Sequence, residues 1–391
     1  MYRNTKVGDR WLNEPFICEK MIIKKIFLNN FRNYSKLDLE LNPKMNIFIG
    51  ENAQGKTNIL ESICVIALTK TYRYGVEENL ISFGKEKSKI SAKVKKSRLV
   101  NTLEIVLDQN DNKKIKVNKQ EIKKISDYIS NLNVIIFTPE DLDIIKGSPN
   151  IRRNLINIEL SQISKKYLNT YNEYNKILKM RNEYLKLLIS SSKENKTYLD
   201  IITDKLIEKA IIIYKERKKY LDKINKNISD IYKNITGDEK LYIKYEPNIS
   251  IDSFEDENLR QKLLSTFNNN YKKELNYGMT LFGPHRDDFS FYLNDDNLKS
   301  FGSQGQQKIA VLSFKLSEID IFKEYSGYKP VLLLDDIFSE LDIKKRNKLL
   351  DYANKDIQSI ITTTDLKNIR KNNIDEAYIF EIKNNEVERR Q

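Results

Sequence analysis

A glycine-rich stretch near the start of the chain has the residue types and spacing of a phosphate-binding loop. Residues Gly50–Thr57 read Gly-Glu-Asn-Ala-Gln-Gly-Lys-Thr and fit the pattern G-x-x-x-x-G-K-T. In such a loop the backbone amides surround phosphates, Lys56 would reach the outer phosphates, and the hydroxyl of Thr57 would hold Mg²⁺. The short apolar run Asn46–Ile49 precedes the loop, and apolar residues at helical spacing follow it over Asn58–Leu68. This order of strand, loop and helix is the setting that the motif requires.

Two adjacent carboxylates follow an apolar run near the other end of the chain. The run Pro330–Leu334 reads as a buried strand and ends at Asp335 and Asp336. Ligands bind at the carboxyl ends of strands in α/β sheets, so Asp335 suits a magnesium site and Asp336 suits a general base or a water-orienting group. The alternative is a surface pair of aspartates that simply ends a strand. Asp342 closes the following run Ser339–Asp342.

A polar glycine turn, Phe301–Lys308, opens an apolar-periodic helix predicted over Ile309–Ile321. A helix N-terminus with free amides and a serine such as Ser303 is a second anion site. An ordinary capped helix explains the same residues. The position of the turn just before the two-carboxylate strand favours the anion site.

Short β-rich runs surround the first loop. Ile22–Leu28 and Leu37–Leu41 predict paired strands, with the segment Asn29–Tyr34 between them. Residues 85–137 alternate strand-like runs with lysine-rich turns. Strands mixed with helices indicate an α/β fold.

The middle of the chain has a different pattern, with apolar residues at alternating spacings of three and four. This spacing predicts two helical seams, separated by the polar break 190–196, that form an antiparallel hairpin. Each helix would have about 35 residues and a length of about 50 Å. The pattern also fits two long helices of a compact bundle. The first seam contains Tyr171, Tyr174, Leu178, Arg181, Leu185 and Leu188; the second contains Ile207, Ala210, Tyr214, Arg217, Leu221, Ile224, Ile228 and Ile231.

Composition sets broad limits on function. The chain has 391 residues and a formal net charge of +13, which favours a polyanionic partner, nucleic acid before a membrane surface, although a biased genome would give the same excess of lysine. Cys18 and Cys64 stand in no disulfide or zinc spacing, which favours a reducing cytoplasm. No bilayer-spanning run or signal segment is evident, so we expect a soluble protein that is not exported.

These patterns divide the chain into four parts. Residues 1–20 are polar and patternless and hold Trp11; they suggest an upstream start codon or extension outside the core, or an ordinary flexible terminus before Met21. We expect residues 21–150 to form a lobe with the phosphate loop, 151–275 to form an inserted helical arm domain, and 276–391 to form a lobe with the Ser303 turn and the two aspartates after the buried strand.

Four motifs stand in the order typical of the ABC ATPase superfamily, which the chain therefore resembles. They are the phosphate loop Gly50–Thr57, the turn at Ser303, the strand that ends at Asp335 and Asp336, and the run Ser339–Asp342. The helical insertion between the phosphate loop and the serine turn resembles SMC and Rad50 heads more than transporter subunits. Within that group the chain is similar to the RecF family. The resemblance covers Met21–Gln391 and is carried by Asn30–Tyr34, Gly50–Asn58, Phe137–Leu142, Lys146–Pro149, Arg152-Arg153, Gly283–Asp288, Ser303–Gln307 and Leu334–Asp342.

The resemblance implies a role for each motif. Lys56 and Asp336 would be catalytic, Thr57 and Asp335 would hold Mg²⁺, and Asp342 would belong to the Ser-x-Leu-Asp loop, the D-loop of the superfamily. The signature residues Ser303, Gly305 and Gln306 would contact the γ-phosphate that Lys56 of a second subunit holds. ATP would be bound by Gly50, Glu51, Asn52, Ala53, Gln54, Gly55, Lys56, Thr57 and Asn58.

The resemblance also implies an activity and partners. The chain would be a weak, DNA-stimulated, Mg²⁺-dependent ATPase of DNA replication, repair and the SOS response. It would dimerise with ATP, bind single-strand/double-strand junctions at gaps, and help RecR and RecO load RecA, without a membrane partner. An SMC-like tether would need longer coils, a transporter ATPase a smaller insertion, and an ABC-plus-nuclease protein a further acidic metal cluster after Asp342.

Three departures from the wider superfamily bear on mechanism. Asp336 stands where most ABC enzymes have glutamate, and Thr362–Asp365 stands where many have histidine, so we expect slow hydrolysis. The lid segment Phe137–Leu142 has no glutamine to sense a γ-phosphate. His285, the one histidine, is either a packed residue or a contact to nucleotide or DNA.

Overall fold

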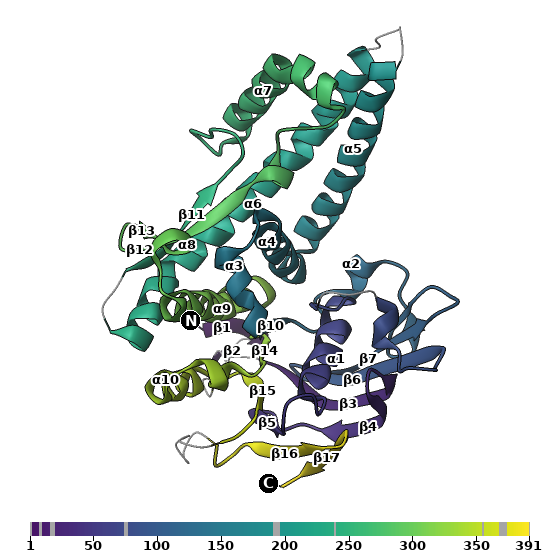
Figure 1. Cartoon of the computed structure of the whole chain (residues 1–391), viewed down its shortest axis with the longest axis vertical. Coiled ribbons are helices and arrows are strands. Elements are labelled where there is room, and N and C mark those ends of the chain that lie inside the picture. Colours follow the sequence, from purple (N-terminus) through teal and green to yellow (C-terminus); the bar gives the residue numbers. More distant parts are fainter. Residues whose placement is uncertain are drawn as a thin grey trace. The chain divides into compact units, whose positions relative to one another are not determined.

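The computed structural model describes residues 2–7, 10–15, 20–73, 77–190, 196–237, 240–353, 356–366 and 374–390 (Figure 1). The chain divides into two compact units. The first comprises Met1–Ile122, Asn131–Ile136 and Phe322–Gln391, and the second comprises Lys123–Ser130 and Phe137–Ile321. Each unit therefore combines segments that are distant in the sequence. These units cut the chain differently from the predicted lobes and arm, whose boundaries stay a prediction.

The first unit contains a central six-stranded sheet. Its order is β10-β14-β15-β5-β16-β17, and the β14–β15, β15–β5 and β5–β16 pairs are parallel. Almost every residue of β5, β14 and β15 is buried, as expected for parallel strands that are covered on both faces. The strands span Val134–Phe137 (β10), Val331–Leu334 (β14), Gln358–Thr363 (β15), Met45–Ile49 (β5), Tyr378–Lys383 (β16) and Glu386–Arg389 (β17).

An antiparallel sheet of order β4-β3-β6-β7-β8-β9 forms the other layer of this unit. The predicted strand pair near the start is confirmed, but the strands are longer than expected, and β3 pairs with β4 as far as Phe31 and Tyr34. Only Arg32 and Asn33 therefore remain between them. The strands span Tyr34–Glu40 (β4), Met21–Phe31 (β3), Lys87–Lys96 (β6), Leu99–Asp108 (β7), Lys114–Val117 (β8) and Gln120–Glu121 (β9).

Helix α1 (Lys56–Leu68) packs against β6 and β7 of the antiparallel sheet and against β15 of the central sheet. The first unit also contains the short helices η1 (Glu77–Leu80) and η4 (Ile337–Glu340) and the helix α10 (Ile343–Ala353). The predicted order of strand β5, loop and helix α1 is confirmed.

The N-terminal residues have more structure than their composition predicts. β1 (Tyr2–Val7) and β2 (Arg10–Pro15) pair with each other in an antiparallel hairpin, which the sequence pattern did not indicate. Within the described part of the chain, neither strand joins another sheet. Cys18 lies outside the described residues.

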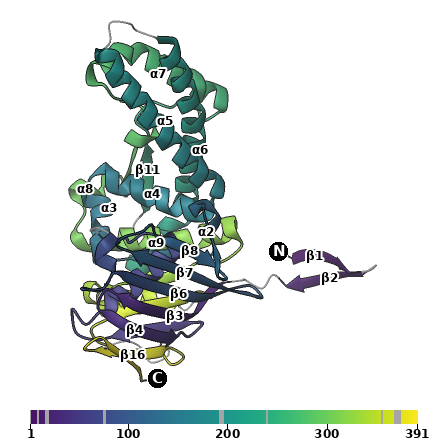
Figure 2. The same cartoon turned by 90° about the vertical axis from the view of Figure 1, so that its right-hand side faces the viewer.

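The second unit is mostly helical (Figure 2). A small sheet of order β11-β12-β13 accompanies its helices, and the last five residues of α9 belong to the first unit. The elements are α2 (Ile125–Tyr128), η2 (Pro139–Leu142), α3 (Asp143–Lys146), α4 (Pro149–Ile163), α5 (Lys165–Ser190), α6 (Lys196–Thr236), β11 (Leu241–Glu246), α7 (Asp256–Tyr277), η3 (Pro284–Arg286), β12 (Asp288–Leu293), β13 (Asp296–Asn297), α8 (Leu298–Phe301) and α9 (Gln304–Ser326).

Helices α5 and α6 form the predicted pair. They have 26 and 41 residues, where about 35 each was expected, and so are about 39 Å and 62 Å long. Every position of the second predicted seam is buried, as are four of the six positions of the first. Most of the predicted break lies outside the described residues. Because α7 also packs against α5 and α6, the pair is not a bare two-helix coil. No helix in the described ranges is long and apolar enough to span a membrane.

Candidate nucleotide-binding site

Two glycines allow the loop to fold tightly between β5 and α1. Gly55 has φ +99, and a Cβ there would lie 2.5 Å from the side chain of Asn33 and 2.8 Å from the hydroxyl of Tyr34. Tyr34 donates a hydrogen bond to the Gly55 carbonyl at 3.2 Å. At Gly50 a Cβ would lie 2.7 Å from the Ile382 carbonyl oxygen of β16. Only glycine fits both positions without displacing the neighbouring segments.

Lys56 is held inside its own loop. Its Nζ donates to the carbonyl oxygens of Gly50 at 2.5 Å and Glu51 at 2.8 Å, and the residue is only 6% exposed. Burial lowers the pKa of Lys56, against the opposing attraction of Asp336 and Asp335. Among the described side chains, no carboxylate forms an ion pair with this ammonium group. Lys56 is therefore a buried cation whose present partners are two carbonyls of the loop.

A short hydrogen-bonded chain joins the loop to the two carboxylates after β14. Thr57 Oγ1 donates to Asp335 Oδ1 at 3.0 Å, and Thr362 Oγ1 donates to the same oxygen at 2.7 Å. The backbone amide of Asp336 donates to Thr362 Oγ1 at 2.9 Å. Thr362 lies near the end of β15, the strand beside β14, and its hydroxyl holds both aspartates in place. Sequence reasoning noted this threonine only as a replacement for histidine; Thr364 of the same string is exposed.

The neighbouring oxygens of Thr57 and Asp335 fit Mg²⁺. A hydroxyl and a carboxylate are hard oxygen ligands, and Mg²⁺ typically binds one or two carboxylates together with phosphate oxygens and water. The sequence predicted this pair, and the two atoms lie 3.0 Å apart. In the described ranges no group of three or more His, Cys, Asp or Glu side chains could hold a metal ion by itself. Phosphate oxygens would therefore have to complete the magnesium site.

Asp336 has a backbone conformation that few residues adopt. Its φ is 44° and its ψ is 28°, in the left-handed region, and it precedes the short helix η4. Asp and Asn tolerate this region better than residues with longer side chains. The turn directs the chain away from the strand immediately after Asp335. This local conformation gives a physical reason for aspartate at a position where glutamate is common.

The predicted signature lies at the start of α9 in the second unit. The Gln306 amide donates to Ser303 Oγ at 3.2 Å, and the Ser303 amide donates to Gln306 Oε1 at 2.9 Å. This reciprocal pair is a capping box, so the capped-helix interpretation holds for the isolated chain. Ser303 and Gly305 are nevertheless exposed, and nothing lies within 4 Å of a Cβ placed at Gly305. The helix end is thus stable and open to a ligand.

Two other predicted residues have clear local partners. Asp342 accepts from the Lys345 amide at 2.9 Å and pairs with the Lys345 ammonium at 2.8 Å, so it caps α10. His285 accepts at Nδ1 from Tyr174 at 2.6 Å and donates at Nε2 to the Thr280 carbonyl at 3.2 Å. Burial lowers the pKa of His285 to about 4. The geometry therefore favours a packed, neutral histidine.

Comparison with known proteins shows the family of the chain. Residues 22–388 match the family described as RecF/RecN/SMC N terminal domain. The DNA replication and repair protein RecF of Listeria innocua is 40% identical over 370 residues, which cover 94% of this chain and 100% of that relative. The chain belongs to the RecF family.

Solved structures support the same placement. A structure of the recombination mediator protein RecF with ATP, in the RecFOR pathway, is similar with a TM-score of 0.87 and 34% identity, covering 96% of this chain and 99% of the other. The Smc head domain of Pyrococcus furiosus, with an extended coiled coil, has a TM-score of 0.55 and 14% identity over 94% of this chain and 96% of the other. The second similarity shows a shared ABC-type fold alone.

Behind the loop of this RecF-family chain lies a network that sequence reasoning did not assign. Arg32 forms a two-pronged contact with the buried Glu61 of α1, at 2.7 and 2.9 Å. Thr71 donates to Glu61 at 2.6 Å, and Tyr72 donates to Asp335 Oδ2 at 3.4 Å. Burial, together with Asp335, raises the pKa of Tyr72 far above its usual range, so the hydroxyl stays a donor. The resemblance string that contains Arg32 was the only signal available from sequence.

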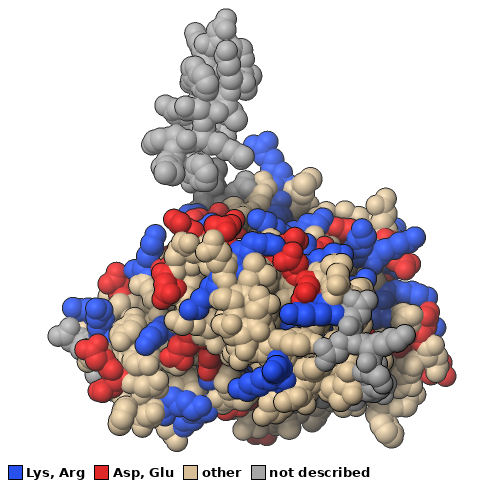
Figure 3. All heavy atoms as spheres, turned by 90° about the horizontal axis from the view of Figure 1, so that it is seen from above, with Lys and Arg blue, Asp and Glu red and all other residues tan. Residues whose placement is uncertain are grey.

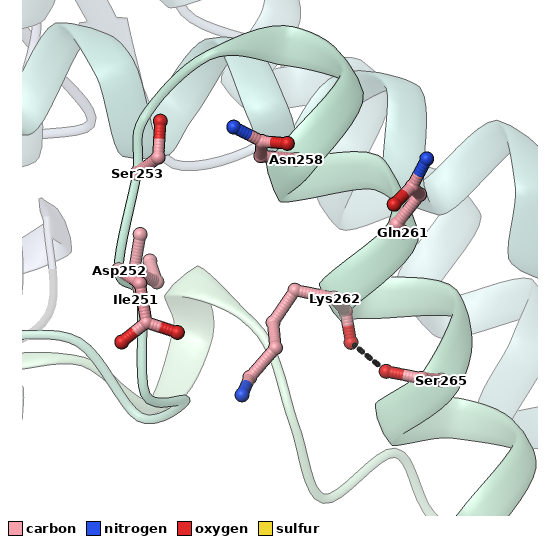
Figure 4. A pocket seen from close by; sticks show the side chains of 7 residues that line it. All are labelled: Ile251, Asp252, Ser253, Asn258, Gln261, Lys262 and Ser265. Atoms are coloured by element: carbon pink, nitrogen blue, oxygen red, sulfur yellow. Dashed lines mark hydrogen bonds between the residues drawn. The ribbon is translucent and has the colours of Figure 1, made fainter.

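An open polar hollow of about 510 Å³ lies elsewhere, in the second unit (Figure 4). The residues that line it come from 251–253 and from the first turns of α7, and none is a predicted site residue. Inside it Ser265 donates to the Lys262 carbonyl at 2.9 Å. This hollow is therefore unrelated to the residues of the nucleotide site.

Proposed function

We propose that this chain is an ATP-dependent DNA-binding protein of recombinational repair and replication. The observation that carries the proposal is the convergence of Lys56, Thr57 and Asp335, with Thr362 behind them, at the carboxyl ends of parallel strands. A loop of amides with a lysine binds phosphates, and the Thr57 hydroxyl and the Asp335 carboxylate would supply two of the oxygen ligands of Mg²⁺, with phosphate oxygens of the nucleotide completing the site. The solved RecF structure with ATP and the relatives named as DNA replication and repair proteins support the same ligand and role.

ATP binding would join two copies of the chain. Ser303, Gly305 and Gln306 of one copy would contact the γ-phosphate held by Lys56 of the other, because a capped, exposed helix N-terminus attracts an anion. Two nucleotides would then bridge the dimer, with Asp342 near the interface. Hydrolysis removes a bridging charge and so shifts the population toward monomers.

Hydrolysis would be slow and stimulated by DNA. Asp336 would orient or deprotonate the attacking water, although its carboxylate is one methylene shorter than that of glutamate. The exposed Thr364, where a histidine is common, supplies no ring nitrogen to contact the γ-phosphate. Slow hydrolysis suits a protein that stays on DNA while ATP is bound and leaves the DNA after ATP has been hydrolysed.

The proposed DNA substrate is a single-strand/double-strand junction at a gap. Contacts would be made mainly to phosphates, as the net charge of +13 suggests, and binding would weaken with salt. RecR and RecO would be the partners with which the dimer helps load RecA, and the cytoplasm is the expected compartment. A structural tether is less well supported, since α5 and α6 are only about 39 and 62 Å long.

Size-exclusion chromatography with and without Mg·ATP tests whether ATP joins two copies of the chain into a dimer. Wild type is expected to shift to a dimer with ATP, whereas Lys56→Ala should lose about a hundredfold in ATP affinity and stay monomeric. Lys70→Ala, an exposed lysine two residues beyond α1, removes the same charge outside the loop and should behave as wild type. ATP binding without any change in oligomeric state would refute the ATP-bridged dimer.

Gel-shift titration with gapped and intact duplex tests the DNA role. We expect tighter, ATP-dependent binding to the gapped duplex and a steep loss of binding between low and physiological salt. Equal, weak and salt-insensitive binding to both DNAs would contradict the proposal.

A further inference from the structure

Net charge alone does not locate a surface for nucleic acid on this chain. On the face seen in Figure 3, lysine and arginine are interspersed with aspartate and glutamate. Many lysines of the chain are neutralised locally by ion pairs, so the informative residues are described lysines that form no ion pair. The outward face of the antiparallel sheet in the first unit, onto which Figure 2 looks, contains such lysines.

Strand β6 separates its apolar and cationic residues by face. Alternate residues such as Ile90, Ala92 and Val94 are buried on the side that α1 covers. The intervening positions face outward and include four lysines, since side chains alternate along a strand. These lysines are Lys87, Lys89, Lys93 and Lys95.

Only one half of this lysine row is neutralised. Lys87 pairs with Asp108 at 3.0 Å, and Lys89 pairs with Glu104 at 2.6 Å. Within the described part of the chain, Lys93 and Lys95 form no ion pair. Their cross-strand neighbours on β7 are uncharged, a threonine and a valine.

The two unneutralised lysines line a groove of about 620 Å³, here called the β6 groove. Lys24 and Lys25 of β3 also line it, and Glu40 is the one carboxylate among the lining residues. Lys25 is itself paired with Asp38 at 2.8 Å. At the rim, the Arg389 guanidinium lies 3.8 Å from the ring centre of Tyr378 and adds a further positive charge.

We propose that the β6 groove binds the phosphodiester backbone of DNA, at a surface separate from the nucleotide loop. This inference rests on the proposed DNA-binding function and assigns it a location. Alternate lysines of a strand are about 6.8 Å apart, and DNA presents one charge per about 3.4 Å of axis on each strand. Two successive lysines can therefore neutralise phosphates of the same strand.

The composition of the groove indicates contact to phosphates rather than to bases. Lysine is a flexible point charge, whereas base-specific contacts typically use the planar fork of arginine or the amides of asparagine and glutamine. Such phosphate contacts give affinity and position without sequence preference. The β6 groove would thus bind DNA independently of sequence.

The double variant Lys93→Gln/Lys95→Gln tests the inference in the full chain, with gapped duplex and Mg·ATP. The slope of log affinity against log salt concentration should become shallower by about 0.9 per lost phosphate contact, or about 2 in total. Lys87→Gln/Lys89→Gln is the matched control on the same strand and face, with the same change in charge. It should change the slope by less than half as much, although it exposes two carboxylates.

Further measurements separate the possible failures. Lys93→Arg/Lys95→Arg should keep the wild-type slope, and thermal unfolding and ATP affinity should match wild type for all variants. Equal slopes for the two glutamine pairs, or no change in either, would overturn the β6 groove. So would unchanged DNA binding by the Lys93/Lys95 glutamine variant together with lost binding to poly-glutamate, which would indicate an acidic protein partner. If wild type itself binds no DNA, the proposed function has failed.

Discussion

The nucleotide loop and the interior of the helical unit both contain buried cations, but their partners differ. Lys56 is 6% exposed and donates to two carbonyl oxygens of its own loop. Arg217, on α6 in the second unit, is 2% exposed and donates to the Asp287 carboxylate at 3.0 Å, the Pro284 carbonyl at 2.5 Å and Asn157 at 3.0 Å.

The difference in partners distinguishes a cation that is available to a ligand, Lys56, from a cation that stabilises the fold, Arg217. Carbonyls of the loop are neutral partners that phosphate oxygens can replace, and a phosphate contact carries opposite charge as well as a hydrogen bond. A buried carboxylate such as Asp287 is a permanent partner, since neither ion of the pair can leave without exposing the other to an apolar interior. A buried cation that is paired with a buried carboxylate therefore indicates a structural role, whereas a buried cation bonded to loop carbonyls indicates a binding site.

The largest predicted effect follows from removing the buried Arg217–Asp287 ion pair. Arg217→Met should lower the free energy of unfolding by about 3–5 kcal/mol, because it leaves the buried Asp287 without its cation. Lys218→Met, one residue along α6, removes an exposed cation paired with Asp222 at 2.6 Å and should cost under about 0.5 kcal/mol. Chemical unfolding followed by circular dichroism measures both. Similar losses for the two variants would mean that the buried network has no special weight.

A second test concerns Asp336, the carboxylate proposed to orient or deprotonate the attacking water. Asp336→Asn should reduce ATP turnover about a hundredfold, equivalent to about 2.7 kcal/mol, since the amide cannot accept a proton. Asparagine tolerates the left-handed conformation at this position, so ATP binding and unfolding should change little. Asp351→Asn, an exposed residue of α10, gives the same change of charge and should keep full turnover. Steady-state phosphate release is the measurement; full turnover in Asp336→Asn would exclude it as the base.

The third test concerns the residue that joins the two carboxylates. Thr362→Val keeps the shape of the side chain but removes its hydrogen bonds to Asp335 and to the Asp336 amide. The free energy of unfolding should fall by about 1–3 kcal/mol. The Mg²⁺ concentration needed for half-maximal ATP binding should rise. The neighbouring Thr363→Val loses one bond to the Asp365 carbonyl and leaves both carboxylates in place. Magnesium titrations of ATP binding should separate the two variants. An identical dependence on Mg²⁺ would remove Thr362 from the site.

A fourth test concerns a pH dependence in the second unit. Burial raises the pKa of Asp141 from 3.8 to about 6, against the attraction of Lys315. Between about pH 4 and 6 the folded chain then binds more protons than the unfolded chain, so this group lowers stability as pH rises through that window. Asp141→Asn should remove that slope and raise the unfolding midpoint at pH 7.5. Thermal unfolding across pH measures this, and an unchanged slope would show that Asp141 does not titrate there.

The sequence predicted the parts of the molecule that local pattern determines. The strand, loop and helix around Gly50–Thr57, the buried strand before Asp335 and both helical seams have signals within a few residues of each other, and all are present. Partner choice across long separations has no such signal. The polar seam positions Arg181 and Arg217 were visible in the pattern, but Glu274 and Asp287 as their partners depended on folding.

Other features were missed because they depend on neighbouring strands. Thr362 reaches Asp335 only because β15 lies beside β14, and strand order cannot be read from either strand alone. The lysines of β6 are part of an unremarkable lysine-rich segment until the pairing of β6 with β7 shows which of them face a carboxylate.

The position of β5 has a consequence for how the chain folds during synthesis. Both of its sheet neighbours, β15 and β16, come from the last part of the chain, and Ile23 beside this region bonds to Gln358, 335 residues later. Contacts of such long range form late, and domains fold as the ribosome releases them. The phosphate loop therefore leaves the ribosome early, but its strand stays without neighbours until almost the whole chain is made, so a growing chain cannot bind ATP before the helical unit has had time to fold.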